Sequence, residues 1–324
     1  MHIPDAFRIF AAAALVAGGT ALADPGQATA PAAAAPAATA VPAAAAPAPA
    51  AAAPAARKPA GPPLASCKPD GAFTFQDPAG DDDGPGTYKY PTDAVYKPGS
   101  FDITEFQVVP SGDQVEFRVT VKSRIEDPWD SPAWGGNGFS VQMAFIFIDT
   151  GHAAGAGIRD GLPGLNIRFA ADENWDKVVL ISPQPVARVN SEIEQKAPQW
   201  KNRIVVPRIT RAQGRTLVAV VDKSQLGGMP TPSWGYQVVM QSNEGFPAKS
   251  DLLIRKVNEF EGQHRFGGGS DYDNDPHVID ILVPAGGDAT AKQHEILSKY
   301  NKTATTEVKP EDLAVVPMVY PCVK

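Results

Sequence analysis

The chain has 324 residues and a formal net charge of −7 at pH 7. A negative balance argues against nucleic acid or an anionic membrane surface as the partner. Because roughly the first 60 residues lack the composition of a folded domain, about 260 remain for one large domain or two small ones.

Residues 1–23 have the features of a secretory signal. Arg8 precedes an apolar run, and the small residues Ala21 and Ala23 mark a cleavage site after Ala23. The apolar stretch is about 15 residues long, whereas a membrane-spanning helix needs about 20. No cysteine follows to accept a lipid. We therefore predict an exported protein, secreted or periplasmic, with an uncleaved anchor as the alternative.

Residues 24–63 consist almost entirely of alanine and proline. Prolines every few residues remove backbone donors and break any helix, so the segment is predicted to be a disordered, extended, semi-rigid linker. A linker of this kind connects a folded domain to another part, such as a membrane anchor at the N-terminus, so the uncleaved anchor remains an alternative. The folded domain is predicted to span residues 64–324.

The two cysteines, Cys67 and Cys322, fall at opposite edges of this predicted domain. In an exported protein two cysteines most simply pair. We predict a disulfide that joins the first strand to the end of the chain, with two unpaired thiols as the alternative.

Alternation of apolar and polar residues is the dominant pattern in the domain. In residues 115–121 four apolar side chains alternate with three polar ones, which predicts a half-buried strand. Residues 110–113 supply a hairpin turn before it. The segment 139–149 is apolar on both faces near its end, which predicts a central strand covered on both sides.

Further strands are predicted in residues 176–182, 202–209, 216–221 and 236–242, each bounded by glycine, proline, asparagine or serine. The only helical pattern that we identify lies at residues 291–300. Many short strands with glycine- and proline-rich turns predict an all-β fold, an antiparallel β-sandwich.

Several motifs resemble one known family when they are taken together in order. They are "FTFQDPAGDDDGPGTYKYP", "FDITEFQV", "NGFSVQMAFIFIDT", "LPGLNIRFA", "NWDKVVLIS" and "RFGGGSDYDNDPHVIDILVP". They resemble the C-terminal module of glucodextranase and of some amylopullulanases, a DOMON-like module related in fold to family 9 carbohydrate-binding modules. The resemblance implies a β-sandwich that holds a glucan or a cell-surface polysaccharide without catalysis, so we do not expect an enzyme.

Two acidic loops lie near opposite ends of the domain and offer alternating oxygen donors, which suit Ca²⁺. We predict calcium in at least one of them, with solvated turns as the alternative. The candidate ligands are Asp77, Asp81, Asp82 and Asp83 in the first loop, and Asp271, Asp273, Asn274 and Asp275 in the second.

Sugar binding needs flat apolar faces beside hydrogen-bonding groups. Trp129 and Trp134 share one proline- and glycine-rich loop with Asp127, Asp130 and Asn137, which makes that loop the predicted platform. Trp175 and Trp200 stand at predicted strand starts, so they are candidates for sugar contact or for the sandwich core, and Trp234 is interpreted as core.

Three other functions are considered. Some DOMON relatives bind haem, for which Met143 is the one candidate ligand, although a core methionine is the preferred interpretation. The five histidines, His2, His152, His264, His277 and His294, show no zinc spacing. A structural, protein-binding module of the cell envelope is the second alternative. A hydrolase is the third, and no nucleophile motif supports it.

Overall fold

The computed structural model describes residues 72–151, 155–244, 256–270, 274–284, 286–303 and 308–321. The expected signal (1–23), the expected linker (24–63) and both cysteines, Cys67 and Cys322, lie outside these ranges and stay predictions. Among the helices in the described ranges, none is long and apolar enough to cross a bilayer.

The first sheet is antiparallel and has the strand order β1-β2-β3-β9-β8. The predicted alternation in β3 is confirmed, since every second residue from Val115 to Val121 is buried. The β2–β3 turn is tighter than predicted: Ser111 still pairs with Gln114, and Gly112 turns the chain with a φ of 59°. The strands are β1 (Phe73–Gln76), β2 (Ile103–Ser111), β3 (Gln114–Val121), β8 (Ile209–Gln213) and β9 (Thr216–Asp222).

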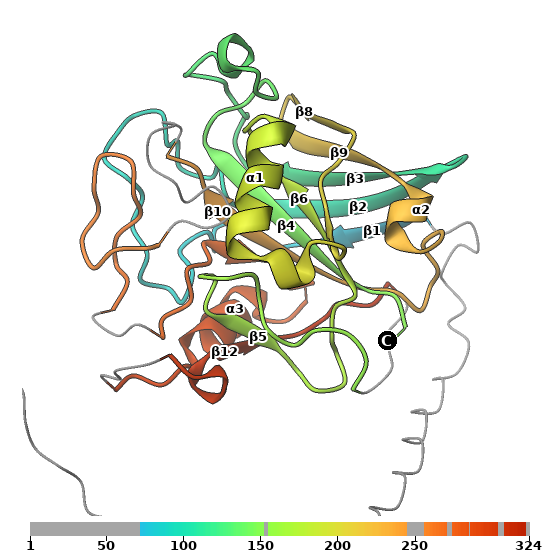
Figure 1. The fold of residues 1–324 in the computed structure, drawn as a ribbon. Helices are drawn as coiled ribbons and strands as arrows, with labels where there is room; N and C mark the ends of the chain where they lie inside the picture. Colours follow the sequence, from blue (N-terminus) through green and yellow to red (C-terminus); the bar gives the residue numbers. More distant parts are fainter. Residues whose placement is uncertain are drawn as a thin grey trace, which may run out of the picture. The chain divides into compact units, whose positions relative to one another are not determined.

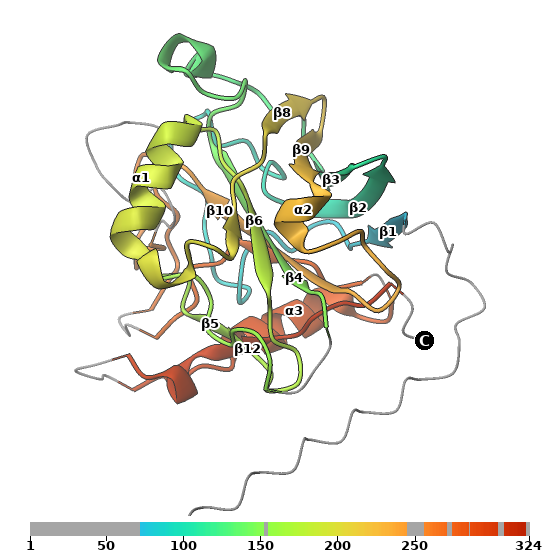
Figure 2. The same cartoon turned by 45° about the vertical axis from the view of Figure 1, so that its right-hand side comes forward.

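The second sheet has the order β11-β10-β4-β6-β7 and is antiparallel except for the β6–β7 pair. Figure 2 shows the two sheets as layers, with α1 on the outer side of the second one. The strands are β4 (Gln142–Asp149), β6 (Lys177–Ile181), β7 (Ile204–Val205), β10 (Gly235–Ser242) and β11 (Asp280–Ile281).

A small parallel sheet and several helices complete the described part of the fold (Figure 1). The parallel pair is β5 (Ile167–Phe169) with β12 (Ala314–Val316). The α-helices are α1 (Val186–Lys196), α2 (Lys223–Leu226) and α3 (Ala289–Ser298), and the 3-10 helices are η1 (Ser131–Trp134), η2 (Pro198–Trp200) and η3 (Pro310–Asp312).

Strand β4 divides the apolar interior into two cores. Ala144, Ile146 and Ile148 point into the first core, between the two sheets, where they meet side chains of β2, β3 and β9. Phe145 and Phe147 point the other way, into a second core covered by α1, α3, β5 and β12. All eight residues of β4 are buried, which confirms the predicted central strand.

The all-β sandwich is confirmed, and the predicted helix at residues 291–300 corresponds to α3. Helix α1 is a correction, because the sequence analysis identified no helix there. Val189, Glu192 and Ile193 have the three- and four-residue spacing of a buried helical stripe. The stripe is short and lies among polar residues, so it gives only a weak helical pattern in the sequence.

Candidate functional site

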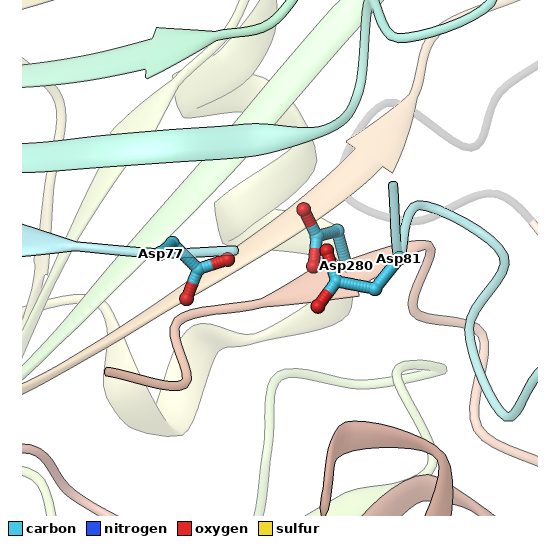
Figure 3. Close-up of side chains that lie close together, drawn as sticks. All are labelled: Asp77, Asp81 and Asp280. Carbon is cyan, nitrogen blue, oxygen red and sulfur yellow. The ribbon is translucent and has the colours of Figure 1, made fainter. Parts of the chain in front are cut away.

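Three buried aspartates converge where edge strands of the two sheets approach each other. Asp77 directly follows β1, Asp81 lies in the turn after it, and Asp280 opens β11. At most 7% of each residue's surface is exposed. One carboxylate oxygen of each lies within 4.8 Å of the others, and Figure 3 shows the Asp77 carboxylate turned toward the other two. We call these three residues the carboxylate cluster.

Two of the aspartates connect the sheets reciprocally. Asp77, from the first sheet, accepts a hydrogen bond on Oδ1 from the backbone N–H of Val283, which follows β11, at 2.6 Å. Asp280, from the second sheet, accepts on Oδ2 from the backbone N–H of Ile103, which opens β2, at 2.6 Å. Each carboxylate is therefore held by the opposite sheet, and its orientation is fixed by backbone groups.

Helix α3 holds the third aspartate. Thr290 donates from Oγ1 to Asp81 Oδ2 at 3.4 Å, and the Gln293 side chain donates to the Asp81 carbonyl oxygen. The second oxygen of each cluster carboxylate is buried and has no hydrogen-bond partner among the described residues: these are Asp77 Oδ2, Asp81 Oδ1 and Asp280 Oδ1. A buried polar atom without a partner is costly, so three in one place require an explanation.

The electrostatics of the cluster disfavour three bare negative charges. Burial, followed by the charge of Asp81, raises the pKa of Asp77 to about 9. Burial, followed by the charge of Asp102, raises the pKa of Asp81 to about 6. Burial also raises the pKa of Asp280 well above its usual range. Asp102 is itself buried, and its Oδ2 lies 3.2 Å from Lys122 Nζ at the protein surface.

The structure does not bring Asp82 and Asp83 into this cluster. Asp82 accepts a hydrogen bond from the Tyr90 hydroxyl, and Asp83 Oδ1 lies 2.7 Å from His294 Nε2. Three adjacent carboxylates in a tight turn thus point in three directions, and only Asp81 points inward. Asp280 was missed by the sequence analysis, although one acidic residue inside the apolar run "HVIDILVP" was a usable signal.

The second acidic loop is placed only in part. Asp275 is buried and its Oδ2 accepts a backbone N–H at 3.1 Å, and Asn274 donates to a backbone carbonyl at 3.1 Å. Neither residue belongs to the carboxylate cluster. Asp271 and Asp273 lie outside the described residues.

A second candidate site is the loop of residues 126–140, which we call the aromatic loop. Asp127 organises it by accepting from the Ser131 N–H at 2.9 Å, from the Ser131 hydroxyl at 2.9 Å, and from the Ser140 hydroxyl. Asn137 donates to the Ser182 carbonyl oxygen at 2.8 Å. These polar side chains, predicted beside a sugar, are used to shape the loop.

The two tryptophans of the aromatic loop are connected. Trp134 donates from its indole Nε1 to the backbone carbonyl of Trp129 at 3.1 Å, and both side chains are half-buried. The Trp129 ring meets Tyr96 and His264 edge-on, with centroids 6.1 and 5.8 Å apart. Trp129 therefore also packs against the first core, which makes Trp134 the less structural of the two.

The other predicted tryptophans differ in exposure. Trp175 is fully buried and donates from Nε1 to the Asp160 carbonyl at 2.8 Å, so it has no free face for a sugar. The expectation of sugar contact is corrected for this residue. Trp200 is half-buried against Trp175, and Trp234 is in the first core, as predicted.

One exposed aromatic residue was not among the candidates. The side chain of Phe260 is 71% exposed, the highest value among the large apolar residues of the described chain. It lies in the same hairpin as His264, which contacts Trp129. The signal in the sequence was an aromatic residue between two glutamates.

Met143, the one candidate haem ligand, is fully buried in the second core. It lies on β4 beside Phe145, on the face that α1 and α3 cover. This placement confirms the interpretation of Met143 as a core methionine.

Comparison with known protein families shows a match. The family described as the C-terminal, SLH-like binding module of glucodextranase matches residues 72–310, which is well over half of the chain. The matched range contains the carboxylate cluster and the aromatic loop. No curated protein matches the chain.

Proposed function

The chain belongs to the family of C-terminal, SLH-like binding modules of glucodextranase, and from this premise we propose that it is an exported, non-catalytic module that binds a glucan or a cell-surface polysaccharide. Membership in a family of binding modules supports a role in binding a polysaccharide rather than in catalysis. The SLH-like character supports a place outside the cell or at its envelope, in agreement with the signal expected in residues 1–23.

The observation that carries the proposed site is the pair of half-buried tryptophans in the aromatic loop. Sugar rings stack on flat apolar faces whose orientation is already fixed, because a fixed side chain loses less entropy on binding. The hydrogen bond from Trp134 to the Trp129 carbonyl fixes the first indole, and packing against Tyr96 fixes the second. Asp130 is exposed in the same loop and is available to sugar hydroxyls.

The test is binding of the purified domain to an array of α-glucans, β-glucans and bacterial cell-surface polysaccharides, followed by calorimetry on the best ligand. We expect Trp134→Ala to weaken binding by roughly tenfold or more, equivalent to about 1.4 kcal/mol. Phe260→Ala, tested separately, shows whether the exposed phenylalanine extends the platform. Trp234→Phe serves as the control, because Trp234 is buried in the first core and is interpreted as core rather than as a sugar contact.

Two results would overturn the proposal. One is the absence of binding to every polysaccharide by a folded domain. The other is unchanged affinity in Trp134→Ala, which would move the sugar site away from the aromatic loop.

A further inference from the structure

The three cluster carboxylates share one feature that hydrogen bonding inside the protein does not explain. In each carboxylate, one oxygen accepts a hydrogen bond from a backbone N–H or from the Thr290 hydroxyl. The other oxygen is buried and has no hydrogen-bond partner among the described residues. The most enclosed of them, Asp280, has no exposed surface at all. The hydrogen bonds from the backbone next to both sheets and from α3 fix the orientation of the three carboxylates, and therefore also the positions of the oxygens without a partner.

The charges around the cluster do not neutralise it. Among the described residues, Lys122 forms an ion pair with Asp102, and the Lys122 side chain is half exposed. Asp102 adds a further negative charge close enough to raise the pKa of each cluster aspartate. Buried carboxylates at this spacing are stable only if protons or a cation neutralise them.

We propose that Asp77, Asp81 and Asp280 bind one divalent cation of the calcium class between the edges of the two sheets. The ligand oxygens lie within 4.8 Å of one another. Ca²⁺ takes roughly six to eight oxygen ligands in flexible geometry, whereas Mg²⁺ demands a nearly ideal octahedron and keeps several waters. Ca²⁺ also tolerates an irregular set of ligands, and waters or carbonyls would complete its shell.

The cation would join two parts of the chain that are distant in sequence. Asp77 and Asp81 belong to the segment after β1, Asp280 belongs to β11, and α3 is attached through Thr290. The ion binds the folded arrangement and not the unfolded chain, so it stabilises the fold by mass action. This inference does not depend on carbohydrate binding.

The experiment uses the purified chain after removal of metal with EDTA and buffer exchange. We measure the melting temperature in EDTA, in CaCl₂, in MgCl₂ and in MnCl₂, and the metal content of protein purified without chelator. We expect Ca²⁺ to raise the melting temperature on the order of 10 °C when free Ca²⁺ is a thousandfold above its Kd. Mg²⁺ should give a smaller shift, and calorimetry should give one Ca²⁺ per chain.

Asp280→Asn should abolish the shift caused by Ca²⁺. The matched control is Asp83→Asn, which removes a carboxylate of the same acidic loop that instead faces His294, and which should keep the shift. Asp81→Asn is the second variant, used if Asp280→Asn does not fold. In EDTA it should be at least as stable as the natural chain, because it removes one of the repelling charges.

The proposal is overturned if the melting temperature of the natural chain is the same in EDTA and in excess Ca²⁺. It is also overturned if a folded Asp280→Asn or Asp81→Asn variant keeps the full shift. In either case the cluster is neutralised by bound protons. Loss of sugar binding without any change in the Ca²⁺ response would concern the aromatic loop alone.

Discussion

At the scale of single residues, burial determines which polar side chains make the stability of the fold depend on pH. Asp280 and His277 are three residues apart in one apolar segment, and both are almost completely enclosed. His277 accepts a hydrogen bond on Nδ1 from the Val257 N–H at 3.3 Å. Burial, followed by the charges of Lys256 and Arg265, lowers the pKa of His277 to about 3.

This enclosed histidine predicts a loss of stability in mild acid. The unfolded chain takes up a proton on His277 below about pH 6.5, while the folded chain stays neutral there until about pH 3. The folded pKa is depressed, so stability is lost as the pH falls through this window. Relative to His277→Gln, the natural chain should lose about 2 kcal/mol of unfolding free energy between pH 7 and pH 5. Urea unfolding of both proteins checks this, and a pH-independent difference would contradict it.

At the scale of elements, the central strands were predictable and the helix on the second core was not. The predicted strand at 202–209 was wrong, because this segment contains β7 and the start of β8, which belong to different sheets. The alternation of apolar and polar residues identified β3, because only one face of this strand is buried. The continuous apolar run identified β4, because both of its faces are buried. Helix α1 buries only Val189, Glu192 and Ile193, and such a short stripe is a weak signal. The carboxylate cluster was half predictable: Asp77 and Asp81 were named, but turn geometry and strand pairing decide which aspartates converge.

Helix α1 offers a matched pair of substitutions. Val189 is 2% exposed against the second core, whereas Val186, in the same helix, is 46% exposed. Val189→Ala should lower the free energy of unfolding by about 2 kcal/mol, because it removes buried methyl groups and leaves a cavity. Val186→Ala should stay within about 0.5 kcal/mol of the natural chain. Equal effects in urea unfolding would mean that α1 does not cover the second core.

At the scale of the whole molecule, the two ends of the described domain meet at one residue. The Tyr236 ring lies 5.9 Å from that of Phe75, and the Tyr236 N–H donates to the Val319 carbonyl oxygen at 2.8 Å. Strand β1 and the last described segment of the chain therefore both contact Tyr236. Cys67 and Cys322 lie outside the described residues, and their pairing stays a prediction.

The pairing predicts a single cross-linked peptide in a digest analysed by mass spectrometry without reducing agent. On the chain-entropy account a loop of this length adds roughly 5 kcal/mol before any strain, so reduction should lower the melting temperature strongly. Labelling of both thiols in the native, oxidised protein would contradict the prediction. A Cys67→Ser, Cys322→Ser variant should then match the natural chain in stability.

The reciprocal connection at Asp77 has a mechanical consequence. Strand β1 is four residues long and pairs only with β2, so it is the weakest place at which to pull the domain by its N-terminal side. Asp77 directly follows β1 and accepts a hydrogen bond from the Val283 N–H. A force applied to β1 would therefore also act on the second sheet through this hydrogen bond. If the proposed cation binds there, it would strengthen this connection between the sheets, and the force needed to detach β1 would increase with the concentration of Ca²⁺.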